Sequence, residues 1–94
     1  MNASLTLPGL CVTLLSMSGK PMPSPCYVDR FPLWRVVGGR KIWHSPDGKR
    51  LFTWDSQHGE IEVFNSLGWH LGALDARTGR IVKQARKGRR LYVR

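Results

Sequence analysis

The residues best suited to chemistry lie together in the middle of the chain, where carboxylates surround a histidine. His58, Glu60 and Glu62 stand two positions apart, and Asp55 precedes His58 by three. Half of the six acidic residues fall within the eight positions from Asp55 to Glu62, in a chain with fifteen Lys and Arg. A surface that only bound a polyanion would gain nothing from carboxylates. These residues therefore indicate proton transfer or metal binding.

Two kinds of chemistry fit this group of side chains. RNA cleavage without a metal needs a base for the 2′-hydroxyl, an acid for the leaving 5′-oxygen and a cation for the transition state, roles that suit Glu, His and Arg. A metal-dependent nuclease would take its ligands from the same four side chains. His44 and His70 lie more than ten residues from His58, so no second histidine at ligand spacing supports a metal. The plain alternatives are an exposed turn histidine and an Asp55 that only caps a turn.

Strand geometry limits how these residues can work together. On an ideal strand the Cα atoms of His58 and Glu62 would lie roughly 13 Å apart, at about 3.3 Å per residue. This is too far for a catalytic pair unless the backbone bends. Gly59 lies between the two residues and permits a bulge or kink that would bring the side chains together.

Charge points to nucleic acid as the partner. The 94 residues allow one small domain and carry a formal net charge of +9, which favours binding to polyanions. Residues 76–94 hold eight basic residues and no acidic one. This tail predicts a phosphate-facing surface, with a solvated basic end as the plain alternative.

The first third of the chain has the composition of a leader or linker. Five of the six prolines lie in residues 1–32, and we expect an N-terminal extension at 1–34 before a domain at 35–94. Its apolar residues 5–17 lack a preceding basic residue and are interrupted by Pro8 and Gly9, so we expect neither a signal peptide nor a membrane span. The apolar cluster at 10–15 could still dock as a short helix or strand. Cys11 and Cys26 are too few for a disulfide framework, and a single bridge between them stays open.

After Leu33, short apolar or β-branched runs alternate with turn signals, which predicts a single, mainly β domain with an antiparallel sheet. The strand candidates are 41–44, 50–54, 60–65, 69–75 and 80–83, with 91–93 a candidate sixth. Pro46-Asp47-Gly48 predicts a hairpin turn between the first two. Alternation in 60–65 places Ile61 and Val63 on one face and the glutamates on the other.

The four tryptophans have two possible uses. Their rings could stack on bases beside a basic groove. In a small β domain, however, we expect two or three in the core and at most one against RNA. They are Trp34, Trp43, Trp54 and Trp69.

The run from Trp54 to Glu62, Trp-Asp-Ser-Gln-His-Gly-Glu-Ile-Glu, resembles the cytotoxic ribonuclease domain of the ribosome-inactivating colicins. The flanking segments match as well, and the resemblance extends from about Trp43 to the C-terminus. These flanks are Gly48-Lys49-Arg50, His70-Leu71-Gly72 and Asp75-x-Arg77-Thr78-Gly79. The resemblance implies a strongly twisted sheet that cuts 16S ribosomal RNA in the decoding site without a metal or other cofactor.

The resemblance also assigns roles by position. Glu62 matches the general base, His58 the general acid, and Asp55 the acidic residue that orients or charges the imidazole. The reaction would leave a 2′,3′-cyclic phosphate. The family's catalytic arginine falls on Arg89, with Arg90 as the neighbouring alternative.

The remaining expectations concern partners. We expect the RNA contacts to come from Lys49, Arg50, Glu60, Arg77, Lys83, Arg86 and Lys87. The resemblance further implies an acidic immunity protein that blocks the domain in the producer, and a toxin that is made in the bacterial cytoplasm, exported or delivered, and active in the cytoplasm of target bacteria. A basic RNA- or ribosome-binding module without activity is the non-enzymatic alternative.

Overall fold

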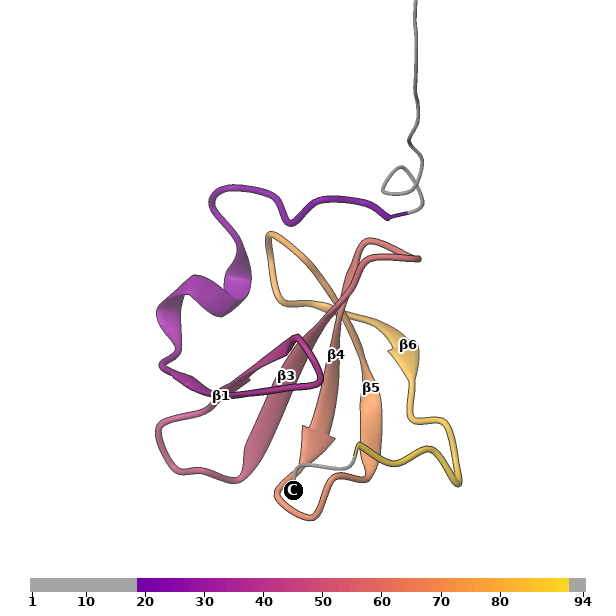
Figure 1. The fold of residues 1–94 in the computed structure, drawn as a ribbon. Helices are drawn as coiled ribbons and strands as arrows, with labels where there is room; N and C mark the ends of the chain where they lie inside the picture. The colour runs from indigo at the N-terminus through magenta and orange to yellow at the C-terminus, as the bar shows by residue number, and fades with distance from the viewer. Residues whose placement is uncertain (1–18, 92–94) are drawn as a thin grey trace, which may run out of the picture.

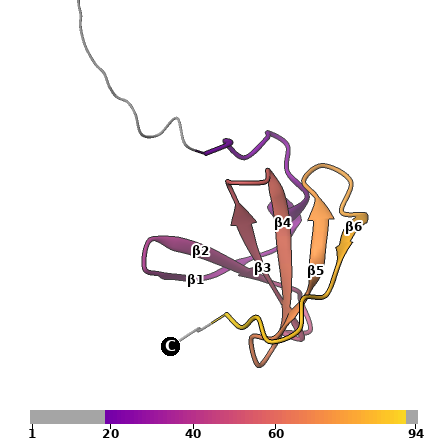
Figure 2. The same cartoon turned by 90° about the vertical axis from the view of Figure 1, so that its right-hand side faces the viewer.

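One antiparallel sheet makes up most of the molecule, and each strand pairs with the next along the chain (Figure 1). The structure is a computed structural model that describes residues 19–91. The strands are β1 (Leu33–Val37), β2 (Arg40–His44), β3 (Arg50–Asp55), β4 (Glu60–Asn65), β5 (His70–Asp75) and β6 (Ile81–Gln84). Figure 2 shows the β1–β2 hairpin extending away from β3, β4 and β5, so the sheet is strongly twisted.

The predicted fold class is confirmed, with one strand missed. The five main strand candidates correspond to β2–β6, with ends that differ by at most one residue. The predicted hairpin turn is confirmed by the Gly48 N–H, which donates to the Ser45 carbonyl at 2.8 Å. Strand β1 was not predicted because four of its five residues are exposed, and the fifth only half-buried, so its sequence shows no apolar alternation. Of the candidate at 91–93, only Leu91 is described, and it lies outside the strands.

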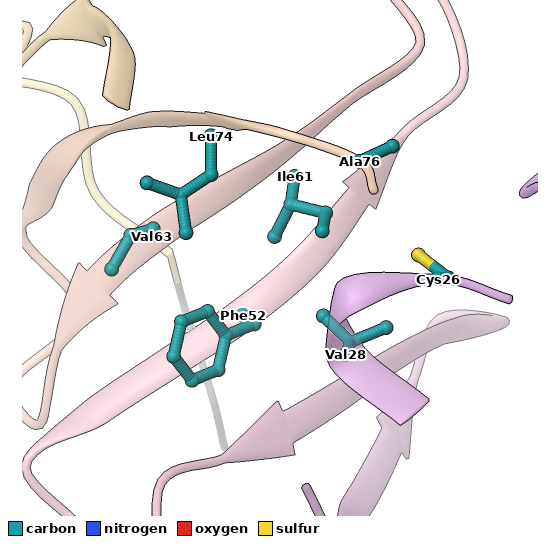
Figure 3. Close-up of a cluster of buried hydrophobic side chains, with 7 residues drawn as sticks. All are labelled: Cys26, Val28, Phe52, Ile61, Val63, Leu74 and Ala76. Carbon is teal, nitrogen blue, oxygen red and sulfur yellow. The ribbon is translucent and has the colours of Figure 1, made fainter. Parts of the chain in front are cut away.

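The main hydrophobic core lies on one face of the sheet and is covered by the N-terminal segment. Ile61 and Val63 of β4 point into it, as alternation predicted, together with Phe52 of β3. Figure 3 shows Cys26 and Val28 from the short 3-10 helix region approaching the same cluster. The buried members are Cys26, Val28, Phe52, Ile61, Val63, Leu74 and Ala76.

The 3-10 helix η3 (Tyr27–Arg30) ties the N-terminal segment to the sheet. The Tyr27 N–H donates to the Ala76 carbonyl at 2.7 Å, and the Phe31 ring stacks on Phe52 with centroids 4.6 Å apart. A Cβ on Gly79 would lie 2.3 Å from the Tyr27 ring, so only glycine allows this approach. The segment before the sheet is therefore part of the packed structure, and contacts to it begin already at Lys20, ahead of η3.

The opposite face of the sheet holds both a second small cluster and the predicted carboxylates. The cluster contains Ile42, Leu51, Phe64 and Leu91. Phe64 and Glu62 alternate with Ile61 and Val63 along β4, so Glu62 lies beside this cluster and is itself 5% exposed.

Some expectations fall outside the described part of the chain. The apolar cluster at 10–15 and the Cys11 half of a disulfide lie there. The division into an extension at 1–34 and a domain at 35–94 stays a prediction. Within residues 19–91, no helix has the length and apolar character needed to cross a membrane.

Candidate active site

The turn between β3 and β4 presents the predicted histidine. Asp55 ends β3, and its Oδ1 accepts the backbone N–H groups of Gln57 and His58 at 3.0 and 3.2 Å. The His58 Nδ1–H donates to Asp55 Oδ2 at 2.7 Å. Gly59 follows with a φ of 70°, which reverses the chain into β4. Gly59 does bend the chain, but within the β3–β4 turn and not within a strand that begins at His58. Strand β4 begins at Glu60, and the His58 ring turns back to bond Asp55.

This turn sets the charge state of Asp55. Burial raises the pKa of the Asp55 carboxyl, but the hydrogen bonds from the His58 ring and the backbone outweigh burial and hold that pKa below its ordinary value. An ionised carboxylate only accepts, so the proton of the 2.7 Å contact is on His58 Nδ1. Nε2 is then the ring nitrogen left to serve a substrate.

Glu62 lies two residues after Glu60 on β4, and its side chain is only 6% exposed. Its Oε2 accepts a hydrogen bond from the Arg89 guanidinium, and its Oε1 lies 3.2 Å from His70 Nε2. A buried carboxylate is stable only with such partners, because desolvation is otherwise costly. The fold thus supplies a cation and an imidazole to Glu62 from two different segments.

His70 is the site residue that sequence reasoning missed. The Arg86 N–H donates to His70 Nδ1 at 2.9 Å, and the His70 N–H donates to the Arg89 carbonyl at 3.0 Å. Since Nδ1 accepts, the proton of the neutral ring is on Nε2, which lies 3.2 Å from Glu62 Oε1 without forming a hydrogen bond to it. His70 therefore holds both ends of the loop that carries Arg89. The signal in the sequence was the His70-Leu71-Gly72 flank, which had no role assigned to it.

A β-bulge brings His70 to this face. Val63 pairs with Gly72, but the next residue, Phe64, pairs with His70 and not with Leu71. Leu71 is the extra residue and is 41% exposed. Without the bulge, alternation would place His70 on the main-core face with Gly72.

These side chains line one cleft of about 390 Å³. Asp55 and His58 come from the β3–β4 turn, Glu62 and His70 from β4 and β5, and Arg89 from the C-terminal loop. The full lining is Asp55, His58, Glu60, Glu62, His70, Ala73, Lys83, Gln84, Ala85, Arg86 and Arg89. Imidazole, carboxylate and guanidinium groups thus share one solvent-open cavity.

Comparison with known proteins agrees with this geometry. The profile of the family described as Cytotoxic matches residues 32–92, well over half of the chain. The chain belongs to the Cytotoxic family. The resemblance to the colicin cytotoxic domains is thereby confirmed, and the membership supports a toxin nuclease as the class of protein.

The curated relatives of this Cytotoxic domain are much longer than the chain itself. Colicin E3 of Escherichia coli is 47% identical over 57 residues, which is 60% of this chain and 10% of the relative. Cloacin of Escherichia coli is 47% identical over 47 residues, 49% of this chain and 8% of the relative. Colicin-E6 of Escherichia coli is 43% identical over 47 residues, which is 49% of this chain and 8% of the relative. The chain spans about a tenth of the length of these relatives.

Of the two candidate arginines, the structure brings Arg89 to the cleft and not Arg90. Arg90 Nε donates to the Leu67 carbonyl at 3.2 Å, and its guanidinium lies over the Trp69 ring at 5.0 Å. Adjacent residues in this extended segment point to opposite sides, so only one of them can face Glu62. Arg89 is therefore the arginine that we propose for the site, and Arg90 contacts the β4–β5 turn.

The predicted RNA-contacting residues divide into two groups. Glu60, Lys83 and Arg86 line the cleft, and Lys83 Nζ lies 2.9 Å from Glu60 Oε1. The others lie outside the cleft lining. Lys87 follows Arg86 in the loop, Arg77 lies in the β5–β6 turn, and Lys49 and Arg50 lie at the end of β3 opposite to Asp55.

The cleft also offers a set of metal-ligand atoms. One ligand atom each from Asp55, His58 and Glu60 lies within 4.8 Å of the others. A carboxylate, an imidazole and a second carboxylate suit a first-row divalent metal. The metal-dependent alternative thus has a specific trio of residues to test.

Proposed function

We propose that this Cytotoxic domain is an endoribonuclease that cuts 16S ribosomal RNA in the decoding site by metal-independent acid–base catalysis. The observation that carries the proposal is that Glu62, His58 and Arg89 line one open cleft on a strongly basic domain. A carboxylate, an imidazole and a guanidinium are the groups that transphosphorylation of RNA requires.

In the proposed reaction Glu62 takes the proton of the 2′-hydroxyl. The 2′-oxygen attacks the adjacent phosphorus, and the bond from phosphorus to the 5′-oxygen breaks. His58 acts as the imidazolium, with a proton on each ring nitrogen: it gives the Nε2 proton to the leaving 5′-oxygen and becomes neutral, while its Nδ1–H stays bonded to Asp55 and keeps the ring oriented. The products are a 2′,3′-cyclic phosphate and a free 5′-hydroxyl.

Arg89 has two roles in this scheme. Its hydrogen bond to Glu62 positions the base, and its positive charge stabilises the charge that develops on the phosphate oxygens. His70 acts on both residues, because it contacts Glu62 and holds the loop of Arg89. It is a positioning residue, since nothing in the scheme requires it to touch the substrate.

Incubation with intact bacterial ribosomes and mapping of the new RNA ends tests substrate and reaction together. We expect a single cut near the 3′ end of the small-subunit RNA, with a cyclic phosphate on the upstream fragment. Cuts scattered over both ribosomal RNAs, or a 3′-hydroxyl beside a 5′-phosphate, would contradict the proposal.

The metal-dependent nuclease is the second candidate, on the strength of the Asp55, His58 and Glu60 trio. It predicts that cleavage stops in EDTA and returns with Mg²⁺ or Mn²⁺. The acid–base scheme predicts that the rate is unchanged by the chelator. The non-catalytic alternative predicts binding to the small subunit without any new RNA ends.

Partners and site of action follow from the same proposal. We propose an acidic immunity protein as the inhibitor, since a +9 domain attracts an acidic protein as it attracts RNA. The domain would be delivered to target bacteria and act on ribosomes in their cytoplasm. Co-expression tests the first point: an acidic partner should restore growth of cells that make the domain and co-purify with it at low salt.

A further inference from the structure

A second hollow lies across the β3–β4 turn from the cleft. It has a volume of about 400 Å³, similar to the cleft, and we call it the tryptophan pocket. It is lined by Met22, Gly38, Gly39, Arg40, Lys41, Trp43, Trp54 and Ser56. Successive strand residues point to opposite faces, so Trp54 faces this pocket while Asp55 faces the cleft. The turn therefore separates two cavities that share its backbone.

The lining of the tryptophan pocket combines aromatic rings with positive charge. Trp43 and Trp54 are half-buried and pack against the main core, while Arg40 and Lys41 are exposed on β2. Of the described residues that line the pocket, none is acidic. Aromatic platforms beside cations are how proteins bind single-stranded nucleic acid, through base stacking and phosphate contacts.

The two rings are held in place before any ligand binds. Trp54 Nε1 donates to the Lys20 carbonyl at 2.9 Å, and the Trp43 side chain packs against the main core. A platform that is already ordered loses little conformational entropy on binding. The pocket is therefore suited to a ligand and not only to filling by neighbouring side chains.

Lys20 lies against the β3–β4 turn, between the tryptophan pocket and the cleft. Its N–H donates to the Ser56 carbonyl at 2.7 Å, and a Cβ on Gly59 would lie 2.9 Å from Lys20 Cδ. Lys20 thus lies on the turn that carries His58, and Figures 1 and 2 both show the N-terminal segment passing beside this turn. A strand of RNA that crossed the turn would meet basic residues in the cleft, on the turn and in the pocket.

We propose that the tryptophan pocket binds a nucleotide of the same RNA strand that is cut in the cleft. The base packs against the indoles of Trp43 and Trp54, and its phosphate contacts Arg40 and Lys41. This inference rests on the proposed ribonuclease function and adds to it a substrate requirement. A single-stranded segment must extend beyond the scissile bond to fill both cavities.

Binding of uncleavable RNA tests the inference apart from catalysis. The ligands are fluorescently labelled 2′-O-methyl oligonucleotides of two and six nucleotides, which lack the attacking hydroxyl. Three proteins are compared by anisotropy over a range of salt: the parent, Arg40→Gln with Lys41→Gln, and a control with Arg35→Gln and Arg80→Gln. The control removes the same charge from exposed residues that line neither cavity.

For the hexanucleotide, we expect the pocket variant to reduce the slope of log K against log salt by about 0.7 for each phosphate that the variant no longer binds. The control should keep the parent slope, and the dinucleotide should bind all three proteins alike because it fills only the cleft. Removal of the base at one end of the hexanucleotide should weaken binding to the parent by roughly fivefold, the lower end of stacking on an aromatic ring.

Equal slopes for the pocket variant and the control would overturn the inference, as would a hexanucleotide whose affinity does not depend on any terminal base. A 5-iodouracil at the same end should cross-link to Trp43 or Trp54, and cross-links confined to the cleft would overturn it too. None of these measurements uses cleavage. A failure of the proposed ribonuclease function is seen separately, as intact RNA in the ribosome assay with the parent protein.

Discussion

The Glu62 carboxylate lies 3.2 Å from His70 Nε2 across the β4–β5 pair, and both side chains are almost fully buried. The ring Nδ1 of the same histidine accepts the Arg86 backbone N–H, and the His70 backbone N–H donates to the Arg89 carbonyl. One side chain thus links the proposed base to the loop of the proposed transition-state cation. Changes at His70 should therefore affect the positions of Glu62 and Arg89 and the stability of the domain, although His70 itself does not react.

Replacement of His70 tests this link. We expect His70→Ala to lower the free energy of unfolding by about 1–3 kcal/mol, because it leaves the Arg86 N–H without its acceptor and removes a partner of buried Glu62. Thermal unfolding measures this decrease, at about 4–8 °C per kcal/mol for a domain of this size.

The conservative variant His70→Asn separates positioning from packing. The Asn Oδ1 can stand in for Nδ1 and accept the Arg86 N–H, so we expect it to recover more of the cleavage rate than His70→Ala does. Equal cleavage rates for both variants would show that the hydrogen bond to the loop does not matter for activity.

Glu62→Gln tests the proposed base directly. The change keeps the shape of the side chain and removes proton transfer, so we expect the single-turnover rate on ribosomes to fall by about 10²–10⁴-fold. Ribosome binding serves as the control and should persist. Cleavage at the parent rate would remove Glu62 from the mechanism.

The neighbouring arginines provide a matched pair. We expect Arg89→Ala to reduce the rate by about 10²–10³-fold, the usual cost of losing one transition-state donor. Arg90→Ala should leave the rate close to that of the parent and cost about 0.5–1 kcal/mol of stability, because its contact with Trp69 is on the surface. The reverse pattern would show that the C-terminal loop rearranges when RNA binds.

Asp55 should make stability depend on pH in the acid range. Its pKa is lower in the folded chain than in the unfolded chain, so its contribution is present above the unfolded pKa, about 3.9, and is lost as pH falls through the lower folded value. We therefore expect Asp55→Asn to lower the free energy of unfolding at pH 7 by on the order of 1–2 kcal/mol. The variant should unfold at a lower temperature than the parent.

The difference between the two proteins should begin to shrink below about pH 4, where Asp55 of the unfolded parent takes up its proton, and should be lost below the lower pKa of the folded chain. Asp47 and Asp75 also have lowered pKa values, from the hydrogen bonds of Ser45 and of Thr78 respectively. Both proteins keep these residues, so the comparison isolates Asp55. A difference that stayed constant with pH would show that the Asp55 charge does not contribute.

Local patterns were enough to predict much of this fold. Turn residues such as Gly48 and alternation along β4 mark the hairpins and the faces, because both depend on a few neighbouring residues. The exposed strand β1 lacked such a pattern, and only its pairing with β2 forms it. Asp55 caps the turn as its neighbours suggested, by accepting the backbone N–H groups of Gln57 and His58, and the same carboxylate also bonds the His58 ring.

Residue types and spacing were enough to indicate a histidine and carboxylates close together on a basic β domain, because both are local properties. Tertiary structure decided which groups meet them. The bulge at Leu71 turns His70 onto the face of Glu62, and the path of the C-terminal loop points Arg89, and not Arg90, at that carboxylate. Both depend on strand register and chain path over more than fifteen residues, and a one-residue change in register moves a side chain to the other face.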